Sequence, residues 1–159
     1  MLETMRWQAE ESFLELLDQT ALPHETRYLK CYDYSGVAAA IKRLAVRGAP
    51  AIGAAAAYGL VLAAKNIMAR SSREDFIAGV EIAARELAAT RPTAVNLRWA
   101  LDRLIKRLYA VEAVDPGALY DILLCDAHAI YREDVAGNRK MGCYGQELIP
   151  DGARILTHC

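Results

Sequence analysis

The stretch that most limits how this chain can fold is residues 47–59, which read Arg-Gly-Ala-Pro-Ala-Ile-Gly-Ala-Ala-Ala-Ala-Tyr-Gly. Proline fits the first helical position, where its missing N–H costs nothing, so Pro50 predicts a helix start. We expect this helix to run to about Met68. Its alanines give it little side-chain bulk and almost no polar face, which predicts close packing by neighbours on several sides.

The same stretch suggests an anion-binding site. The first turn of a helix presents unpaired backbone N–H groups and the positive end of the helix dipole. Gly48 and Ala49 keep side-chain bulk away from this end, and Arg47 adds a planar fork of donors that matches a phosphate or a carboxylate. One interpretation is an anion site at a helix N-terminus. The other is a buried Ala/Gly helix whose Arg47 caps a neighbouring loop.

Composition excludes several classes of function. The 159 residues are 54% hydrophobic and 25% charged, which is typical of a soluble globular protein with one or at most two small domains. A net charge of −1 argues against a nucleic-acid or anionic-membrane surface. No uninterrupted apolar run approaches the roughly 20 residues of a membrane span, and the N-terminus lacks the pattern of a secretory signal.

The cysteines and acidic residues predict neither a disulfide framework nor a metal site. Cys31, Cys125, Cys143 and Cys159 contain no Cys-x-x-Cys pair, so we expect a reducing, cytoplasmic compartment. A cluster on the last helix does not have the spacing of one ligand set and is interpreted as a charged helix face. Its members are Asp126, His128, Glu133 and Asp134.

Local patterns predict an α+β fold, in which a small antiparallel three-stranded sheet is followed by a helical bundle. The strand-like segments are residues 5–7, 12–18 and 26–32, the last of which alternates polar and apolar residues. Two helices are expected first, one after a Ser35 cap with Leu44 on its apolar face and one from Pro50. A third should follow residues 71–75, where Ser71-x-x-Glu74 and Ser72-x-x-Asp75 both fit the reciprocal cap pattern. The last two are expected over residues 95–109 and from Asp115-Pro116 to about residue 148.

A second arginine also stands just before a helix start. Residues 90–97 place Arg91 and Pro92 ahead of Thr93, which can cap the following helix. Alone, Arg91 is interpreted as a surface or capping residue. Two arginines stationed before two helix starts could instead converge on one phosphorylated ligand, which the sequence by itself does not show.

The end of the chain predicts the start of another domain. A Pro-Asp-Gly turn at residues 150–152 leads into a short apolar run, which is typical of a buried strand. A strand of this kind opens a parallel sheet, which needs further strands and binds ligands beyond their carboxyl ends, where Cys159 stands. We therefore expect residues 1–148 to form one domain and residues 149–159 to begin a second, within a larger protein. Taken alone, Cys159 would be interpreted as a buried inert thiol.

Several motifs together resemble one family. Residues 47–53, 90–97, 138–145 and 157–159 resemble the signatures of the 5-methylthioribose-1-phosphate isomerases, and residues 17–25 resemble their N-terminal hairpin. The wider superfamily also contains ribose-1,5-bisphosphate isomerase and the regulatory subunits of eukaryotic translation initiation factor 2B. Asn96-Leu97 and the hairpin at residues 23–25 look more like the methylthioribose branch.

The resemblance implies an aldose–ketose isomerase of methionine salvage, a cytoplasmic homodimer that needs no cofactor or metal and acts on a small-molecule sugar phosphate. It implies that Arg47, Gly48, Ala49 and Arg91 bind substrate, and that Cys159 is catalytic. It also implies a Rossmann-like C-terminal domain that forms the dimer.

The family's catalytic aspartate, a substrate-binding glutamine and an Asn-Lys pair have no counterpart here, so these 159 residues are expected to be a partial, inactive piece. The alternatives are a ribose-1,5-bisphosphate isomerase, a non-catalytic regulatory subunit of the translation-factor type, and an independent helical interaction module.

Overall fold

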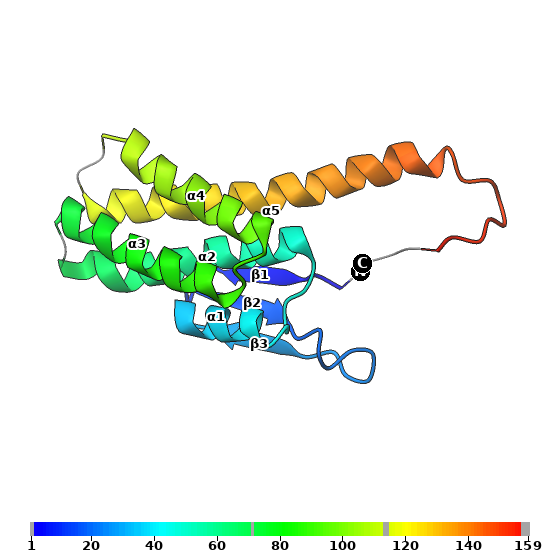
Figure 1. Ribbon diagram of the computed structural model, residues 1–159, viewed down its shortest axis with the longest axis horizontal. Coiled ribbons are helices and arrows are strands. Elements are labelled where there is room, and N and C mark those ends of the chain that lie inside the picture. Colours follow the sequence, from blue (N-terminus) through cyan, green and yellow to red (C-terminus); the bar gives the residue numbers. More distant parts are fainter. Residues whose placement is uncertain (1, 71, 113–114, 157–159) are drawn as a thin grey trace.

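The computed structural model describes residues 2–70, 72–112 and 115–156. Within these ranges, a three-stranded antiparallel sheet is followed by five α-helices, as Figure 1 shows, which confirms the predicted α+β fold. The elements are β1 (Met5–Gln8), β2 (Phe13–Leu17), β3 (Tyr28–Cys31), α1 (Tyr34–Lys42), α2 (Ala49–Ile67), a short 3-10 helix (Met68–Arg70), α3 (Arg73–Thr90), α4 (Val95–Ala110) and α5 (Pro116–Gln146).

The sheet has the order β1-β2-β3 and contributes one face to the core. Met5 pairs with Leu16, and Leu14 pairs with Cys31, in the antiparallel register. All four of these side chains are buried, since alternate residues of a strand point to the same side of a sheet. They join one hydrophobic core with the helices, so the sheet and the bundle form a single packed body.

Helix α2 is the centre of the fold and contacts α1, α3, α4 and α5. Every residue from Ile52 to Ala64 is buried, which confirms the predicted packing on several sides. Small residues make this packing possible. At Gly53, a Cβ atom would lie 2.7 Å from the carbonyl oxygen of Asn96 on α4, so only glycine allows the two helices to approach this closely.

Among the described residues, α2 is also the helix long and apolar enough to cross a membrane, judged by length and composition alone. The expectation from the sequence considered only uninterrupted apolar runs and overlooked this average composition. Because 72% of its most apolar window is buried inside the protein, α2 has the burial of a core helix.

Three helix starts are capped by side chains. Of the two patterns predicted for α3, the one at Ser72 is confirmed, because Ser72 accepts a hydrogen bond from the Asp75 N–H; Ser71 lies outside the described residues. Helix α5 starts after Asp115 as predicted, and the Asp115 carboxylate accepts a hydrogen bond from the Ala118 N–H. The predicted Ser35 cap is wrong. Helix α1 begins earlier, at Tyr34, and the carboxylate of Asp33 accepts from the Gly36 N–H at 2.8 Å.

Two further local predictions are wrong. Leu44 does not lie on the apolar face of α1, because the helix ends at Lys42 and Leu44 turns the chain in the left-handed region, with φ of 64° and an exposed side chain. Thr93 does not cap α4. That helix begins at Val95, so Ala94 occupies the capping position and no side chain of the described residues bonds there.

The last part of the described chain lies outside the bundle. Helix α5 is continuous through Gly137, and its final turns extend beyond the other helices (Figure 1). The predicted buried strand is not formed over the residues described up to 156: Ile155 and Leu156 are 64% and 98% exposed, without strand hydrogen bonds. A strand needs a neighbour to satisfy its backbone groups, and none of the described residues supplies one here.

Candidate anion-binding site

The structure brings the two arginine-bearing segments to one cavity. A hollow of about 340 Å³ is lined by Gly48 and Ala49 from the start of α2, and by Arg91 and residues 93–96 from the start of α4. Gly48, Ala49 and Arg91 therefore lie together, although more than 40 residues separate them along the chain. Sequence alone left this convergence open.

Arg47 lies beside this cavity without being one of its lining residues. Its side chain is exposed, and its backbone carbonyl accepts a hydrogen bond from the Gln19 side-chain amide at 3.3 Å. This hydrogen bond is made by the Arg47 carbonyl and not by its guanidinium, so it does not support the interpretation that the Arg47 side chain caps a loop.

The starts of α2 and α4 are both open at the cavity. Within the described ranges, neither helix receives a side-chain cap, in contrast to α1, α3 and α5. Gly48 occupies the capping position of α2 with φ of 94°, a conformation that disfavours any side chain. Ala94 occupies the same position on α4. First-turn N–H groups that no side chain satisfies are available to an anion.

Arg91 supplies a positive charge between these two helix starts. It is half-buried at the end of α3, and its carbonyl accepts from the Ala94 N–H at 3.0 Å, which closes the turn into α4. A guanidinium held on a short turn loses less freedom on binding than one on a long loop. The cavity therefore combines two helix N-termini with one positioned cation, an arrangement suited to phosphate.

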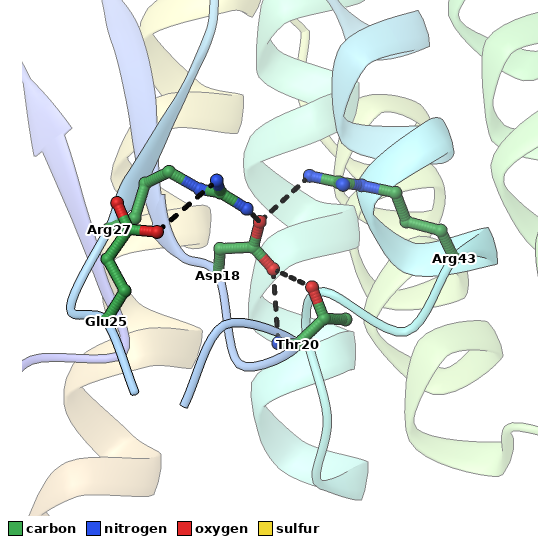
Figure 2. A network of polar contacts seen from close by, with 5 residues as sticks. All are labelled: Asp18, Thr20, Glu25, Arg27 and Arg43. Carbon is green, nitrogen blue, oxygen red and sulfur yellow. Dashed lines mark hydrogen bonds and ion pairs between the residues drawn. The ribbon is translucent and has the colours of Figure 1, made fainter. Parts of the chain in front are cut away.

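Sequence reasoning missed a buried carboxylate next to this site. Asp18, at the end of β2, is fully buried and accepts hydrogen bonds from Thr20, Arg27 and Arg43, as Figure 2 shows. The Thr20 hydroxyl, and then the two arginines, lower the pKa of Asp18 to about 2 against the opposing effect of burial. The available signal was an aspartate two residues before a threonine, the pattern of an Asx turn.

A second hollow adjoins the first. It has a volume of about 380 Å³ and shares Val95 and Asn96 with the cavity at the helix starts. Its lining is largely apolar, from Pro50, Trp99 and Ile130, and it also carries the carboxylates of Glu133 and Asp134. The two adjoining hollows thus differ in lining: the first has two helix starts and Arg91, and the second is largely apolar.

The cysteine assigned to catalysis, Cys159, lies outside the described residues. Of the cysteines inside them, Cys31 is buried, and burial raises its thiol pKa to about 11, whereas Cys125 and Cys143 are exposed. None of these three lines either hollow. Among the described residues, therefore, no cysteine at either hollow is an alternative candidate for the catalytic thiol.

The acidic cluster on α5 does not form a ligand set. His128 Nδ1 lies 2.8 Å from the Tyr58 hydroxyl, and burial lowers its pKa. Glu133 binds Arg103 through both oxygens, at 2.5 and 2.9 Å. Within the described ranges, no group of three His, Cys, Asp or Glu side chains is close enough to hold a metal ion.

Comparison with known proteins identifies the family. Residues 45–159 match the sequence model of the initiation factor 2 subunit family. The chain belongs to this family. Among curated members, it is 64% identical over 159 residues to a methylthioribose-1-phosphate isomerase from Pelotomaculum thermopropionicum, covering 100% of this chain and 43% of that protein. It is 53% identical to the isomerase of the same name from Desulforudis audaxviator, covering 99% and 44% of the two chains.

Solved structures from the initiation factor 2 subunit family show the same fold. The 5-methylthioribose 1-phosphate isomerase from Pyrococcus horikoshii superposes with a TM-score of 0.88 at 39% identity, over 96% of this chain and 42% of that one. The translation initiation factor eIF-2B, subunit delta, from A. fulgidus gives a TM-score of 0.85, also at 39% identity, over 96% and 43%. The chain therefore spans less than half the length of the relatives it matches.

Proposed function

We propose that this chain is the phosphate-binding part of an aldose–ketose isomerase that converts 5-methylthioribose 1-phosphate into 5-methylthioribulose 1-phosphate in methionine salvage. The observation that carries the proposal is the cavity where two uncapped helix starts meet Arg91. In this proposal Arg47, Gly48, Ala49 and Arg91 bind substrate. The relatives named as this isomerase, at 64% and 53% identity, support it.

The proposed chemistry suits a site built in this way. A sugar phosphorylated at C1 cannot open its ring simply, so the enzyme must promote ring opening without losing the phosphate. Helix-end amides and guanidinium groups hold the phosphate and fix the sugar ring relative to the reacting groups. In this proposal Cys159 would serve as an acid or a thiolate. An acidic residue that relays protons would come from the second domain.

The apolar hollow favours this substrate over ribose 1,5-bisphosphate. A ligand whose phosphate lies at Gly48 and Arg91 extends toward the neighbouring hollow, which shares Val95 and Asn96. There it meets apolar side chains and the carboxylates of Glu133 and Asp134. A methylthio group gains from apolar contact, whereas a second phosphate would lose hydration against a largely apolar lining without a partner of opposite charge among the residues that line it.

The remaining parts of the proposal concern the whole protein. Residues 1–148 would form the N-terminal domain and residues 149–159 the first strand of a Rossmann-like domain. That domain would close the site and join two copies into a cytoplasmic homodimer. It would also give the exposed run at residues 153–156 the partner strand that it lacks among the described residues.

A non-catalytic regulatory role is the second candidate. It is favoured by the fold shared with the A. fulgidus eIF-2B subunit delta, which is as similar in sequence as the isomerase structure. Such a protein would bind a sugar phosphate without turnover. The presence of a cysteine at residue 159 favours the isomerase.

One assay separates these candidates. The full-length gene product is incubated with methylthioribose 1-phosphate or ribose 1,5-bisphosphate, and formation of the ketose is followed. We expect turnover of the first sugar only. In Arg47→Ala and Arg91→Ala we expect the KM to rise by roughly tenfold or more, because charge-assisted phosphate contacts are lost. Arg85→Ala, an exposed arginine on α3, is the matched control. Unchanged KM values in both test variants would contradict the proposal, and binding without ketose would favour the regulator.

A further inference from the structure

The loop that carries Arg47 and Gly48 is held in place from the end of β2. This loop, residues 43–48, joins α1 to α2 and contains two residues with positive φ, Leu44 and Gly48. The end of α1 holds the first of these two residues, since the Leu44 and Ala45 N–H groups donate to the Ile41 and Ala40 carbonyls at 3.1 and 2.9 Å. Ala45 and Val46 are also buried in the core. Further contacts reach the loop from the end of β2.

The contacts from the end of β2 come from two adjacent residues, Asp18 and Gln19, which we call the brace. The Asp18 carboxylate accepts a hydrogen bond from the Arg43 guanidinium at 3.3 Å. The Gln19 backbone N–H donates to the Ala45 carbonyl at 2.9 Å, and the Gln19 side-chain amide donates to the Arg47 carbonyl at 3.3 Å. Alternate residues of the loop are thus each bonded to the brace.

The brace is itself rigid. Asp18 is fully buried, and each of its oxygens is occupied: one accepts from the Thr20 backbone N–H and hydroxyl at 3.1 and 2.6 Å, the other from Arg27 and Arg43. In Figure 2, Arg27 and Arg43 reach one oxygen of the Asp18 carboxylate from the left and from the right, and Thr20 bonds the other oxygen. The Asp18 backbone N–H also donates to the Arg27 carbonyl, at 2.9 Å, which fixes the chain direction at the end of β2.

We propose that Asp18 and Gln19 are positioning residues for the anion site: they set where the Arg47 guanidinium and the open start of α2 stand relative to Arg91. Neither residue is among those that line the cavity. The inference rests on the proposed phosphate site and adds residues to it. Misplacing a binding group by about 1 Å can cost a large factor in rate or affinity, so loosening the loop weakens phosphate binding without removing any phosphate contact.

Two variants test the brace, one at the buried Asp18 and one at the exposed Gln19 contact. In Asp18→Asn, the amide oxygen can keep the Thr20 bonds, but the NH₂ group then faces two arginine donors and neither arginine has its acceptor. Gln19→Met removes only the donor to the Arg47 carbonyl, and this contact is exposed, so we expect the fold to be retained. Glu15→Gln is the matched control, because Glu15 lies on the same strand and bonds Gln8, away from the loop.

The experiment measures binding and turnover separately in the full-length protein. Inorganic phosphate is titrated by calorimetry, KM and kcat are measured with methylthioribose 1-phosphate, and the melting temperature is recorded for each variant. For Gln19→Met, we expect phosphate affinity and KM to weaken together by roughly three- to tenfold at an unchanged melting temperature. For Asp18→Asn, we expect a larger loss together with a lower melting temperature. Glu15→Gln should match the wild type in every measurement.

The outcomes are distinguishable. If the wild type binds phosphate but produces no ketose, the proposed isomerase function fails, and the calorimetry still decides the role of the brace. If Gln19→Met and a folded Asp18→Asn bind phosphate as the wild type does, the positioning role is wrong and Asp18 serves stability alone. If Asp18→Asn does not fold, the Gln19→Met affinity decides by itself. A wild type that does not bind phosphate overturns both proposals.

Discussion

The helix starts of this protein fall into two groups. Those of α1, α3 and α5 are capped by Asp33, Ser72 and Asp115, each of which accepts a hydrogen bond from a first-turn N–H. Those of α2 and α4 have Gly48 and Ala94 at the same position and, in the described part of the chain, no side-chain cap. The capped starts are separate from the cavity, whereas both open starts line it.

The capped and the open helix starts differ in what their first-turn N–H groups can do. A side-chain cap stabilises a helix by about 1 kcal/mol, so leaving two starts uncapped gives up stability. The same N–H groups then remain available to a ligand. Where the two open starts meet, the chain also places Arg91 and braces the neighbouring loop. We therefore propose that the anion site uses the two helix starts that, in the described part of the chain, lack the side-chain cap present on α1, α3 and α5.

The largest effect is expected where the two open starts are brought together. In Gly53→Ala, the added methyl group would lie 2.7 Å from the Asn96 carbonyl oxygen, so α4 must move away from α2. We expect a loss of about 1–3 kcal/mol in the free energy of unfolding, measured by urea denaturation, and weaker phosphate binding. Gly137→Ala is the control, because nothing lies near its added methyl group on exposed α5. Equal unfolding free energies and equal phosphate affinities of the two variants would show that the close approach of α2 and α4 at Gly53 is unimportant.

The next effect concerns the brace beside the open start of α2. Because the pKa of Asp18 is lowered to about 2 in the folded protein, its carboxylate contributes stability above its unfolded pKa, near 4, and this contribution is lost as the pH falls toward 2. We expect the contribution to be about 2 kcal/mol. Unfolding free energies measured from pH 5 to pH 2 should fall less steeply in Asp18→Asn than in the wild type. Parallel curves would contradict this role of Asp18.

The difference between the two groups of helix starts can be removed directly by adding a side-chain cap to an open start. Ala94 has φ of −80° and ψ of 94°, an extended backbone that suits a capping residue. Ala94→Asp should stabilise α4 by up to about 1 kcal/mol, yet weaken phosphate binding by roughly tenfold, since a carboxylate then occupies the anion site. Calorimetry with inorganic phosphate and thermal unfolding measure the two effects. Ala94→Ser separates capping from charge, and tighter phosphate binding by Ala94→Asp would refute the assignment of the open starts.

The smallest effect is expected at a capped start. Ser72→Ala removes the hydrogen bond to the Asp75 N–H on α3 and should cost about 1 kcal/mol of stability. Phosphate affinity should not change, because Ser72 does not line the cavity. Thermal unfolding and the same titration check both parts. A loss of affinity here would mean that capped and open starts do not differ in function.

Local chemistry predicted much of this fold correctly. The central helix followed from Pro50 and its alanines, and the caps on α3 and α5 followed from Ser72 and Asp115 with their spacing. Local rules failed at Ser35, where an aspartate two residues earlier is in the position to accept the hydrogen bond. They also failed at Thr93, because α4 starts one residue later than a Thr93 cap requires.

The site followed from the sequence only in part. Arg47, Gly48, Ala49 and Arg91 were named from their place before two helix starts, and their role as substrate-binding residues remains a prediction. The cavity shared by Gly48, Ala49 and Arg91, and the buried Asp18, were not predictable, because both depend on contacts between segments distant along the chain.

The sequence by itself determined which segments become helices and strands, since periodicity, proline and capping side chains act over one or two turns of chain. The tertiary structure decided which helix starts face each other and what holds them there. Contacts such as that of Gly53 with Asn96, or Asp18 with Arg43, join segments far apart along the chain and exist only in the packed tertiary structure. Their energies depend on burial and on distance in space, which the order of residues does not specify.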